Sequence, residues 1–108
     1  MIDENALKNH FDNDVEMIHE ILKIFCETYP ESLSLLENAL EQKEIKNIEF
    51  HAHTLKGMIS NFFCDELTEA ALFIENSNRN NQLEVCDEKV KLLKEKLPLL
   101  VEKLRDIK

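Results

Sequence analysis

Glycine and proline are almost absent from this sequence. Its 108 residues include one glycine and two prolines, and tryptophan is missing altogether. Because glycine and proline mark most tight turns, their scarcity predicts few connections and therefore long secondary-structure elements. A glycine-rich loop that cradles phosphates cannot be built, so the chain should not bind ATP. We therefore expect no kinase activity and no self-phosphorylation.

Basic residues are also scarce. Lys and Arg number 13 against 22 Asp and Glu, which gives a formal net charge of -9. Nucleic-acid binding needs a basic face to displace counterions, so this balance argues against it and favours a soluble monomer. No apolar run approaches the roughly 20 residues of a membrane span. Asp3 and Glu4 lie where a signal peptide would be basic, so we expect a cytoplasmic protein.

The three cysteines and four histidines do not indicate a metal centre. Cys26, Cys64 and Cys86 are odd in number, widely spaced and set among apolar neighbours. This predicts small buried hydrophobic residues in a reducing cytosol rather than disulfides or metal ligands. His51 and His53 would point about 200° apart on a helix, so they cannot bind one metal ion from the same face. We expect neither a metal site nor a cofactor.

The sequence is rich in helical periodicity. Apolar residues recur at alternating steps of three and four along most of the chain, which is typical of helices with one buried face. The pattern predicts a short helix within residues 1–12 and longer helices over 15–40, 45–62 and 83–107. Another helix should begin at an N-cap on Asp65 and end at the polar cluster 76–81.

Two of the predicted helices contain a proline. Pro30 and Pro98 interrupt their apolar stripes without shifting the phase, which favours kinked continuous helices over separate ones that pack in different directions. Long amphipathic segments with short links predict an all-α fold, an antiparallel four-helix bundle with a short additional N-terminal helix. Because no repeat or linker interrupts the chain, residues 1–108 should form a single domain.

Gly57, the sole glycine, falls inside the predicted third helix rather than in a turn. A glycine at such a position costs about 1 kcal/mol relative to alanine, so helix formation alone does not favour it. It lies one turn after His53 and beside Lys56, away from the buried stripe of that helix. A missing side chain next to an imidazole and an ammonium suggests space cleared for a bulky anion such as a phosphoryl group.

Several residues share this side of the predicted helix: Glu49, Phe50, His53, Lys56, Gly57 and Ser60. A neutral imidazole can attack phosphorus, and an unperturbed histidine is mostly neutral near pH 7. Lys56 can reach back to phosphoryl oxygens through a charge-assisted hydrogen bond. Phe50, with Glu49 and Ser60 nearby, would leave a docking surface for a partner. The alternative is a solvated helix face on which His53 and Lys56 have no function.

The segment Ala52–Gly57, with the sequence A-H-T-L-K-G, resembles the phosphorylation motif A-H-x-L-K-G of histidine-containing phosphotransfer (HPt) domains. The similarity continues through residues 60–62. Leu67 and the pair 74–75 lie where the family has an apolar anchor and a Leu-Glu pair. The preceding helix, with Phe25 and Pro30, is also similar to the family pattern, so the resemblance covers nearly the whole chain.

This resemblance implies a phosphocarrier of a two-component phosphorelay rather than an enzyme. His53 would carry the phosphoryl group, Lys56 would bind it, and Gly57 would keep it accessible. Glu75 on the next helix would orient the imidazole through its other nitrogen, and Arg79 could add a second cation. The implied partners are receiver domains of response regulators, which supply the aspartate and the magnesium site, and a sensor or hybrid histidine kinase.

The sequence also departs from the family pattern. Phe63 and Cys64 stand where the family usually has a glycine and a small residue, so the following loop should take a different shape. Met58 and Ile59 also replace residues that are commonly small. Two alternatives stay open: a helical adaptor that binds a receiver domain or another protein without carrying phosphate, and a phosphohistidine domain cut from a chemotaxis-type kinase.

Overall fold

The computed structural model describes residues 2–77 and 83–108, and within these residues it contains helices and no strand. The helices are α1 (Glu4–His10), α2 (Val15–Gln42), α3 (Ile45–Ser60), α4 (Asp65–Asn76) and, after the short 3-10 helix η1 (Leu83–Val85), α5 (Cys86–Arg105). The predicted all-α class is therefore confirmed.

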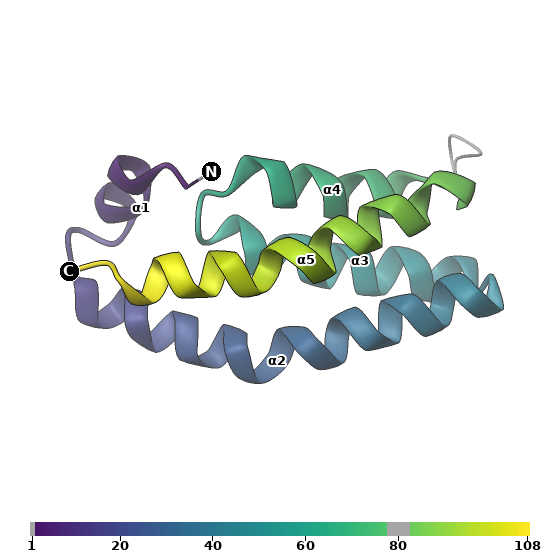
Figure 1. Ribbon diagram of the computed structural model, residues 1–108, viewed down its shortest axis with the longest axis horizontal. Coiled ribbons are helices and arrows are strands. Elements are labelled where there is room, and N and C mark those ends of the chain that lie inside the picture. Colours follow the sequence, from purple (N-terminus) through teal and green to yellow (C-terminus); the bar gives the residue numbers. More distant parts are fainter. Residues whose placement is uncertain (1, 78–82) are drawn as a thin grey trace.

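Helices α2 to α5 run antiparallel and form a four-helix bundle (Figure 1). Helix α3 packs against α2 and α4, and α5 packs against α4 and α2, so the four helices close into a ring around one core. The short helix α1 lies at the end of the bundle where both chain ends lie. The backbone N–H of Asp3 donates to the carbonyl of Phe63 at 3.1 Å and ties this segment to the α3–α4 connection.

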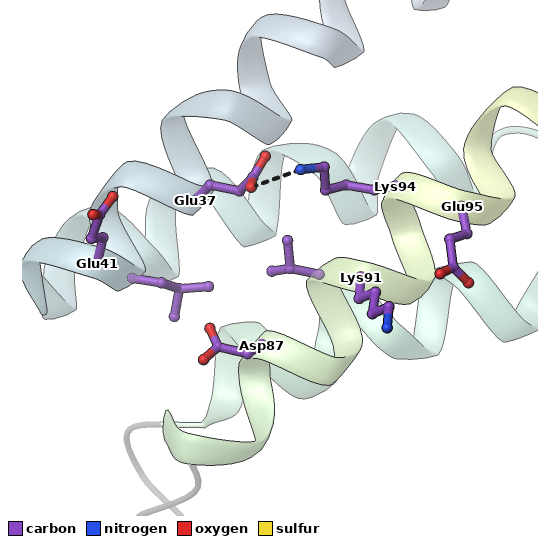
Figure 2. Close-up of a pocket in the computed structure, with 8 residues that line it drawn as sticks. Glu37, Glu41, Asp87, Lys91, Lys94 and Glu95 are labelled. Carbon is purple, nitrogen blue, oxygen red and sulfur yellow. Dashed lines mark hydrogen bonds and ion pairs between the residues drawn. The ribbon is translucent and has the colours of Figure 1, made fainter.

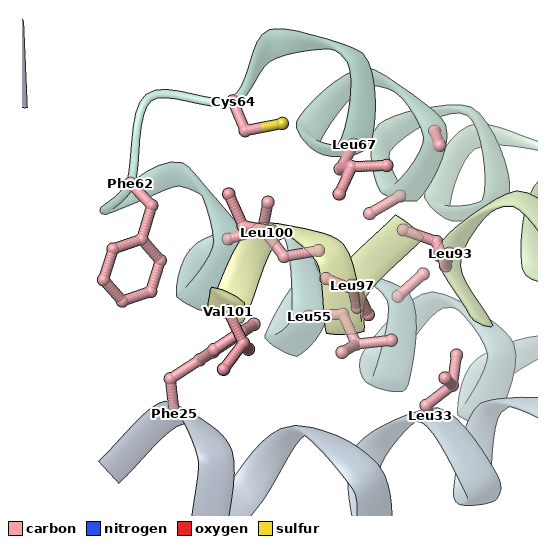
Figure 3. Packing of buried hydrophobic residues seen from close by; sticks show 14 of the residues in the cluster. Phe25, Leu33, Leu55, Phe62, Cys64, Leu67, Leu93, Leu97, Leu100 and Val101 are labelled. Atoms are coloured by element: carbon pink, nitrogen blue, oxygen red, sulfur yellow. The ribbon is translucent and has the colours of Figure 1, made fainter. Parts of the chain in front are cut away.

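The core is built from the apolar stripes that the periodicity predicts. The α3 residues of that stripe are at most 1% exposed: Ile48, Ala52, Leu55, Ile59 and, just after the helix, Phe62. Phe25 and Leu33 of α2 are also buried, and the rings of Phe25 and Phe62 meet edge to face with their centroids 5.2 Å apart (Figure 3). Because this side of α3 is fully enclosed, the opposite side of the helix faces solvent.

Both helix-interior prolines are accommodated without a break. Helix α2 continues through Pro30 and α5 continues through Pro98. Each proline removes one backbone donor, and in Figure 1 α2 is visibly bowed along its length. The prediction of continuous helices, rather than two shorter ones in place of each, is therefore confirmed.

The helix ends differ from the prediction in several places. The prediction of Asp65 as an N-cap is wrong, because Cys64 is the N-cap and Asp65 is the first residue of α4. Asp65 and Glu66 instead lie in the first turn, where their charge favours the positive end of the helix dipole. Helix α3 ends at Ser60 rather than at residue 62, and the last apolar segment opens with a 3-10 turn. The N-cap of α2 is Asp14, whose Oδ1 accepts a hydrogen bond from Met17 N at 3.0 Å.

The α3–α4 connection bends at Phe63, which has a φ of 55°. This left-handed conformation favours glycine, so Phe63 adopts it despite its side chain. Of the three cysteines, Cys64 and Cys86 are buried as predicted and Cys26 is half-buried. Burial raises the pKa of the Cys64 and Cys86 thiols. Over residues 2–77 and 83–108, no helix combines the length and the apolar character that a bilayer crossing requires.

Candidate functional site

His53 and Glu75 meet between two neighbouring helices. His53 is in the third turn of α3, and its side chain is 66% exposed on the face opposite the core stripe. Glu75 lies near the end of α4, which packs along α3. The Nδ1 atom of His53 and the Oε2 atom of Glu75 are 3.1 Å apart, a hydrogen-bond distance. One side of the imidazole is thus fixed to the protein, while the ring remains open to solvent.

Glu75 also contacts Lys56. The Lys56 Nζ atom lies 2.8 Å from Oε1, and the two side chains are 26% and 21% exposed. Partial burial raises the pKa of Glu75, but the close Lys56 ammonium and the His53 imidazole lower it more, and the net pKa lies below the ordinary value. Glu75 is therefore ionised at neutral pH and holds two cationic or cation-forming side chains, one with each oxygen.

The ionised carboxylate fixes the tautomer of His53. A carboxylate can only accept hydrogen bonds, so the proton between His53 and Glu75 must belong to Nδ1. In a neutral imidazole the other nitrogen, Nε2, then carries a lone pair and no proton. This arrangement presents a nucleophilic nitrogen to an electrophile that arrives from solvent.

Gly57 leaves open space one turn after His53. A Cβ atom built on Gly57 would have no heavy atom within 4 Å beyond its own helix backbone and chain neighbours. The φ of Gly57 is not positive, so its backbone is one that other residues adopt readily in a helix. The hydroxyl of Ser60 donates to the Gly57 carbonyl at 2.9 Å and is occupied within the helix. Neither a strained backbone nor a close packing contact therefore requires a glycine here.

The remaining predicted residues differ in how far they are exposed. Phe50 is 65% exposed, Glu49 is half-buried and Ser60 is exposed, all on α3. Arg79 lies outside the described residues, so its predicted part as a second cation stays a prediction. The sequence analysis does not single out Ile24 of α2, whose side chain is 57% exposed. The sequence does carry a signal of this exposure, because Ile24 is out of phase with the buried stripe of α2.

Within residues 2–77 and 83–108, no three His, Cys, Asp or Glu side chains gather closely enough to hold a metal ion. His51, two residues before His53, is half-buried and packs edge to face against Phe50 with ring centroids 5.3 Å apart. The site therefore consists of the hydrogen-bonded imidazole of His53, the carboxylate of Glu75, the ammonium of Lys56 and the unfilled space beside Gly57.

A sequence profile of the Hpt domain family matches residues 20–106 of this chain. Among curated proteins, the phosphorelay intermediate protein rdeA of Dictyostelium discoideum is 26% identical over 106 residues, which cover 98% of this chain and 42% of that protein. The chain thus spans less than half the length of this relative. No solved structure matches the chain significantly. Because the family profile matches well over half of its residues, this chain belongs to the Hpt domain family.

Proposed function

We propose that this protein is a histidine phosphotransfer protein of a phosphorelay, which carries a phosphoryl group on His53 and exchanges it with aspartates of receiver domains. Membership of the Hpt family and the relative named as a phosphorelay intermediate support this role. The observation that carries it is the exposed imidazole of His53, held at Nδ1 by Glu75 with Nε2 left free. Hpt proteins are phosphocarriers rather than kinases, so the phosphoryl group must come from a partner.

The transfer step follows from this geometry. The Nε2 lone pair attacks the phosphorus of an aspartyl phosphate on the receiver, the N–P bond forms, and the bond from phosphorus to the aspartate oxygen breaks. The aspartate leaves as a carboxylate, and the reverse step passes the phosphoryl group to another receiver. The imidazole gains positive charge as the N–P bond forms, and the ionised Glu75 at 3.1 Å stabilises that charge. Positioning and charge neutralisation supply most of the catalysis in such transfers.

Lys56 and Gly57 would receive the phosphoryl oxygens. Lys56 follows His53 by three residues on the same helix and already lies beside the imidazole through their shared contact with Glu75. Its ammonium can turn from Glu75 to a phosphoryl group on Nε2 with a charge-assisted hydrogen bond. The absence of a side chain at Gly57 leaves room for that group and for the approaching receiver.

The partners would be receiver domains and a sensor or hybrid histidine kinase, and the chain would act as a cytoplasmic monomer. We assign docking to the exposed part of α3, where Phe50, Glu49 and Ser60 surround the histidine face. Phe50 in particular exposes an aromatic ring that a partner can cover. A transient complex of this kind buries a modest area, with an apolar centre and a polar edge.

Incubation with a phosphorylated receiver domain tests the proposal directly. The chain should take up phosphate that is labile in acid and stable in base, and His53→Gln should take up none while folding normally, because the imidazole is largely exposed. His51→Gln serves as the matched control and should label like the unmodified chain. Uptake by His53→Gln would place the phosphate elsewhere, and receiver binding without any uptake would favour a non-catalytic adaptor.

A further inference from the structure

A small hollow lies between α2 and α3, and its lining on α3 begins at Met58, the residue after Gly57. It has a volume of about 150 Å³ and is walled on the α2 side by Ile21, Ile24 and Thr28. Met58 and Asn61 wall it on the α3 side. Met58 follows Gly57 in the chain, and Asn61 lies one helical turn beyond Gly57. The hollow therefore borders the unfilled space beside Gly57. We call it the Ile24–Met58 socket.

None of the side chains that line the Ile24–Met58 socket is charged. This is notable in a chain of which 32% is charged, and other hollows of the described surface differ. One of these, about 600 Å³ between α2 and α5, is crossed by an ion pair of 3.1 Å (Figure 2). Its lining includes the apolar residues Leu40 and Val90, but the other six residues are charged: Glu37, Glu41, Asp87, Lys91, Lys94 and Glu95. The socket beside Gly57 is therefore suited to an apolar group, whereas the α2–α5 hollow is a solvated, charged surface.

Ile24 exposes apolar surface at the socket. Its side chain lines the socket and is 57% exposed, and among the large hydrophobic side chains of the described residues only that of Phe50 is more exposed, at 65%. Phe50 lies about two turns before Met58 on α3 and does not line the socket. An exposed apolar side chain at an uncharged hollow marks a surface that a partner can cover.

The Met58 side chain lines the socket and is only weakly held in place. Thr28 Oγ1 donates to the carbonyl of Ile24 at 2.9 Å and lies 3.3 Å from Met58 Sδ. Because its proton already has a carbonyl acceptor, the hydroxyl holds the thioether only weakly. A methionine so placed can change rotamer and adapt the socket to the shape of its occupant.

The position of the socket determines what can occupy it. Phosphoryl transfer at His53 requires the reacting atoms to approach within about 3 to 3.5 Å, so a receiver must lie over Gly57 and continue onto the surface beside it. A volume of about 150 Å³ is smaller than the roughly 300 Å³ or more of ordinary small-molecule sites, but it suffices for a single side chain. The uncharged lining selects an aliphatic one.

We infer that the Ile24–Met58 socket receives one aliphatic side chain of the receiver domain during transfer, and that Ile24 and Met58 set which receivers the chain accepts. This inference rests on the proposed function and adds the element that chooses the partner. Burial of an aliphatic anchor in an uncharged socket is the kind of contact that dominates interface affinity. The occupant acts on docking and leaves the chemistry at His53 unchanged.

Transfer kinetics with an Ile24→Ala variant test the inference. The kcat/KM for transfer from a phosphorylated receiver should fall about tenfold, mainly through a higher KM, as expected for loss of an interface anchor. Labelling of His53 by phosphoramidate, a small donor that needs no docking, should persist. Leu99→Ala is the matched control, because Leu99 is 46% exposed on α5 away from α3, and it should transfer normally. In a panel of receivers, Met58→Ala should change the order of preference.

The outcomes separate this inference from the proposed function. Transfer by Ile24→Ala at the rate of the unmodified chain would overturn the socket and leave the role of His53 intact. An equal loss in Leu99→Ala would likewise overturn it, since the effect would not be specific to the socket. Failure of the unmodified chain to accept phosphate from both phosphoramidate and a receiver would overturn the proposed function and this inference together.

Discussion

Replacing Gly57 by alanine should raise the stability of the protein, because the new methyl group meets open space. A Cβ at this position has no neighbour within 4 Å, and the backbone of Gly57 does not lie in the left-handed region. The substitution therefore relieves the conformational entropy cost of glycine in a helix, about 0.5–1 kcal/mol, without a steric cost. For a domain of this size the gain corresponds to a rise in Tm of about 2–4 °C.

A longer side chain at the same position should separate stability from function. Gly57→Gln should keep or improve the Tm, since glutamine is a good helix former and the site is open. Its side chain would nevertheless occupy the space that the phosphoryl group and the receiver share, so the transfer rate should fall. Asn47→Gln introduces the same residue at another exposed position of α3 and should transfer normally. Thermal unfolding and receiver-to-histidine transfer are measured on the same preparations.

Two results would refute this reasoning. Full transfer activity in Gly57→Gln would mean that neither the phosphoryl group nor the partner uses the unfilled space beside Gly57. A marked loss of stability in Gly57→Ala would mean that a close approach, rather than accessibility, requires the glycine. The second result would contradict the open space around Gly57 itself.

Two further predictions concern stability. The folded-state pKa of Glu75 is lowered, so the stability it contributes is present above its unfolded pKa of about 4.3 and is lost as the pH falls through the folded value. Urea titrations from about pH 7 to about pH 3 should show the stability difference between the unmodified chain and Glu75→Gln shrinking, and a constant difference would contradict the pairing. Lys43 ends α2 with a φ of 56°, so Lys43→Gly should raise the free energy of unfolding by about 1 kcal/mol. Lys91→Gly, at an exposed position inside α5, should lower it by a similar amount, and equal signs for the two lysines would refute the argument.

The helices are predictable from the sequence because burial leaves a periodic pattern. Ile18, Leu22 and Phe25 are at most 4% exposed, and the steps of four and three between them place α2 and its inner face correctly. The same phase argument carries α2 through Pro30, because the stripe resumes at Leu33 on the same side. A change in direction would have moved Leu33 away from the core.

Helix ends are less predictable, because they depend on a single residue's backbone and its local hydrogen bonds rather than on a repeating pattern. Asp65 has a side chain suited to an N-cap, yet the N-cap of α4 is Cys64. Lys43 and Phe63 take positive φ values, and because the single glycine of the chain lies elsewhere, no glycine marks these two turns. The N-cap of α2 is Asp14, which belongs to a cluster of acidic and amide residues immediately before an apolar stripe, so here the local sequence does mark the helix start.

In the candidate site, the relation between residues on one helix is predictable from the sequence, whereas the contact between residues on two helices is not. His53 and Lys56 share a helix, so their spacing alone places them on one side. Which residue of α4 contacts them depends on how α3 and α4 cross, and periodicity does not specify this crossing. The expected role of Glu75 rests instead on the family resemblance. The contact of Lys56 with Glu75 at 2.8 Å differs from the expectation from sequence, in which Lys56 binds a phosphoryl group. The contact of Lys56 with Glu75 and its expected contact with a phosphoryl group are compatible, because a partly buried ammonium pairs with the nearest anion. A phosphoryl group carries up to about two negative charges, whereas Glu75 carries one. Phosphorylation at Nε2 would therefore draw Lys56 away from Glu75, while the hydrogen bond from Nδ1 keeps the same carboxylate on the imidazole.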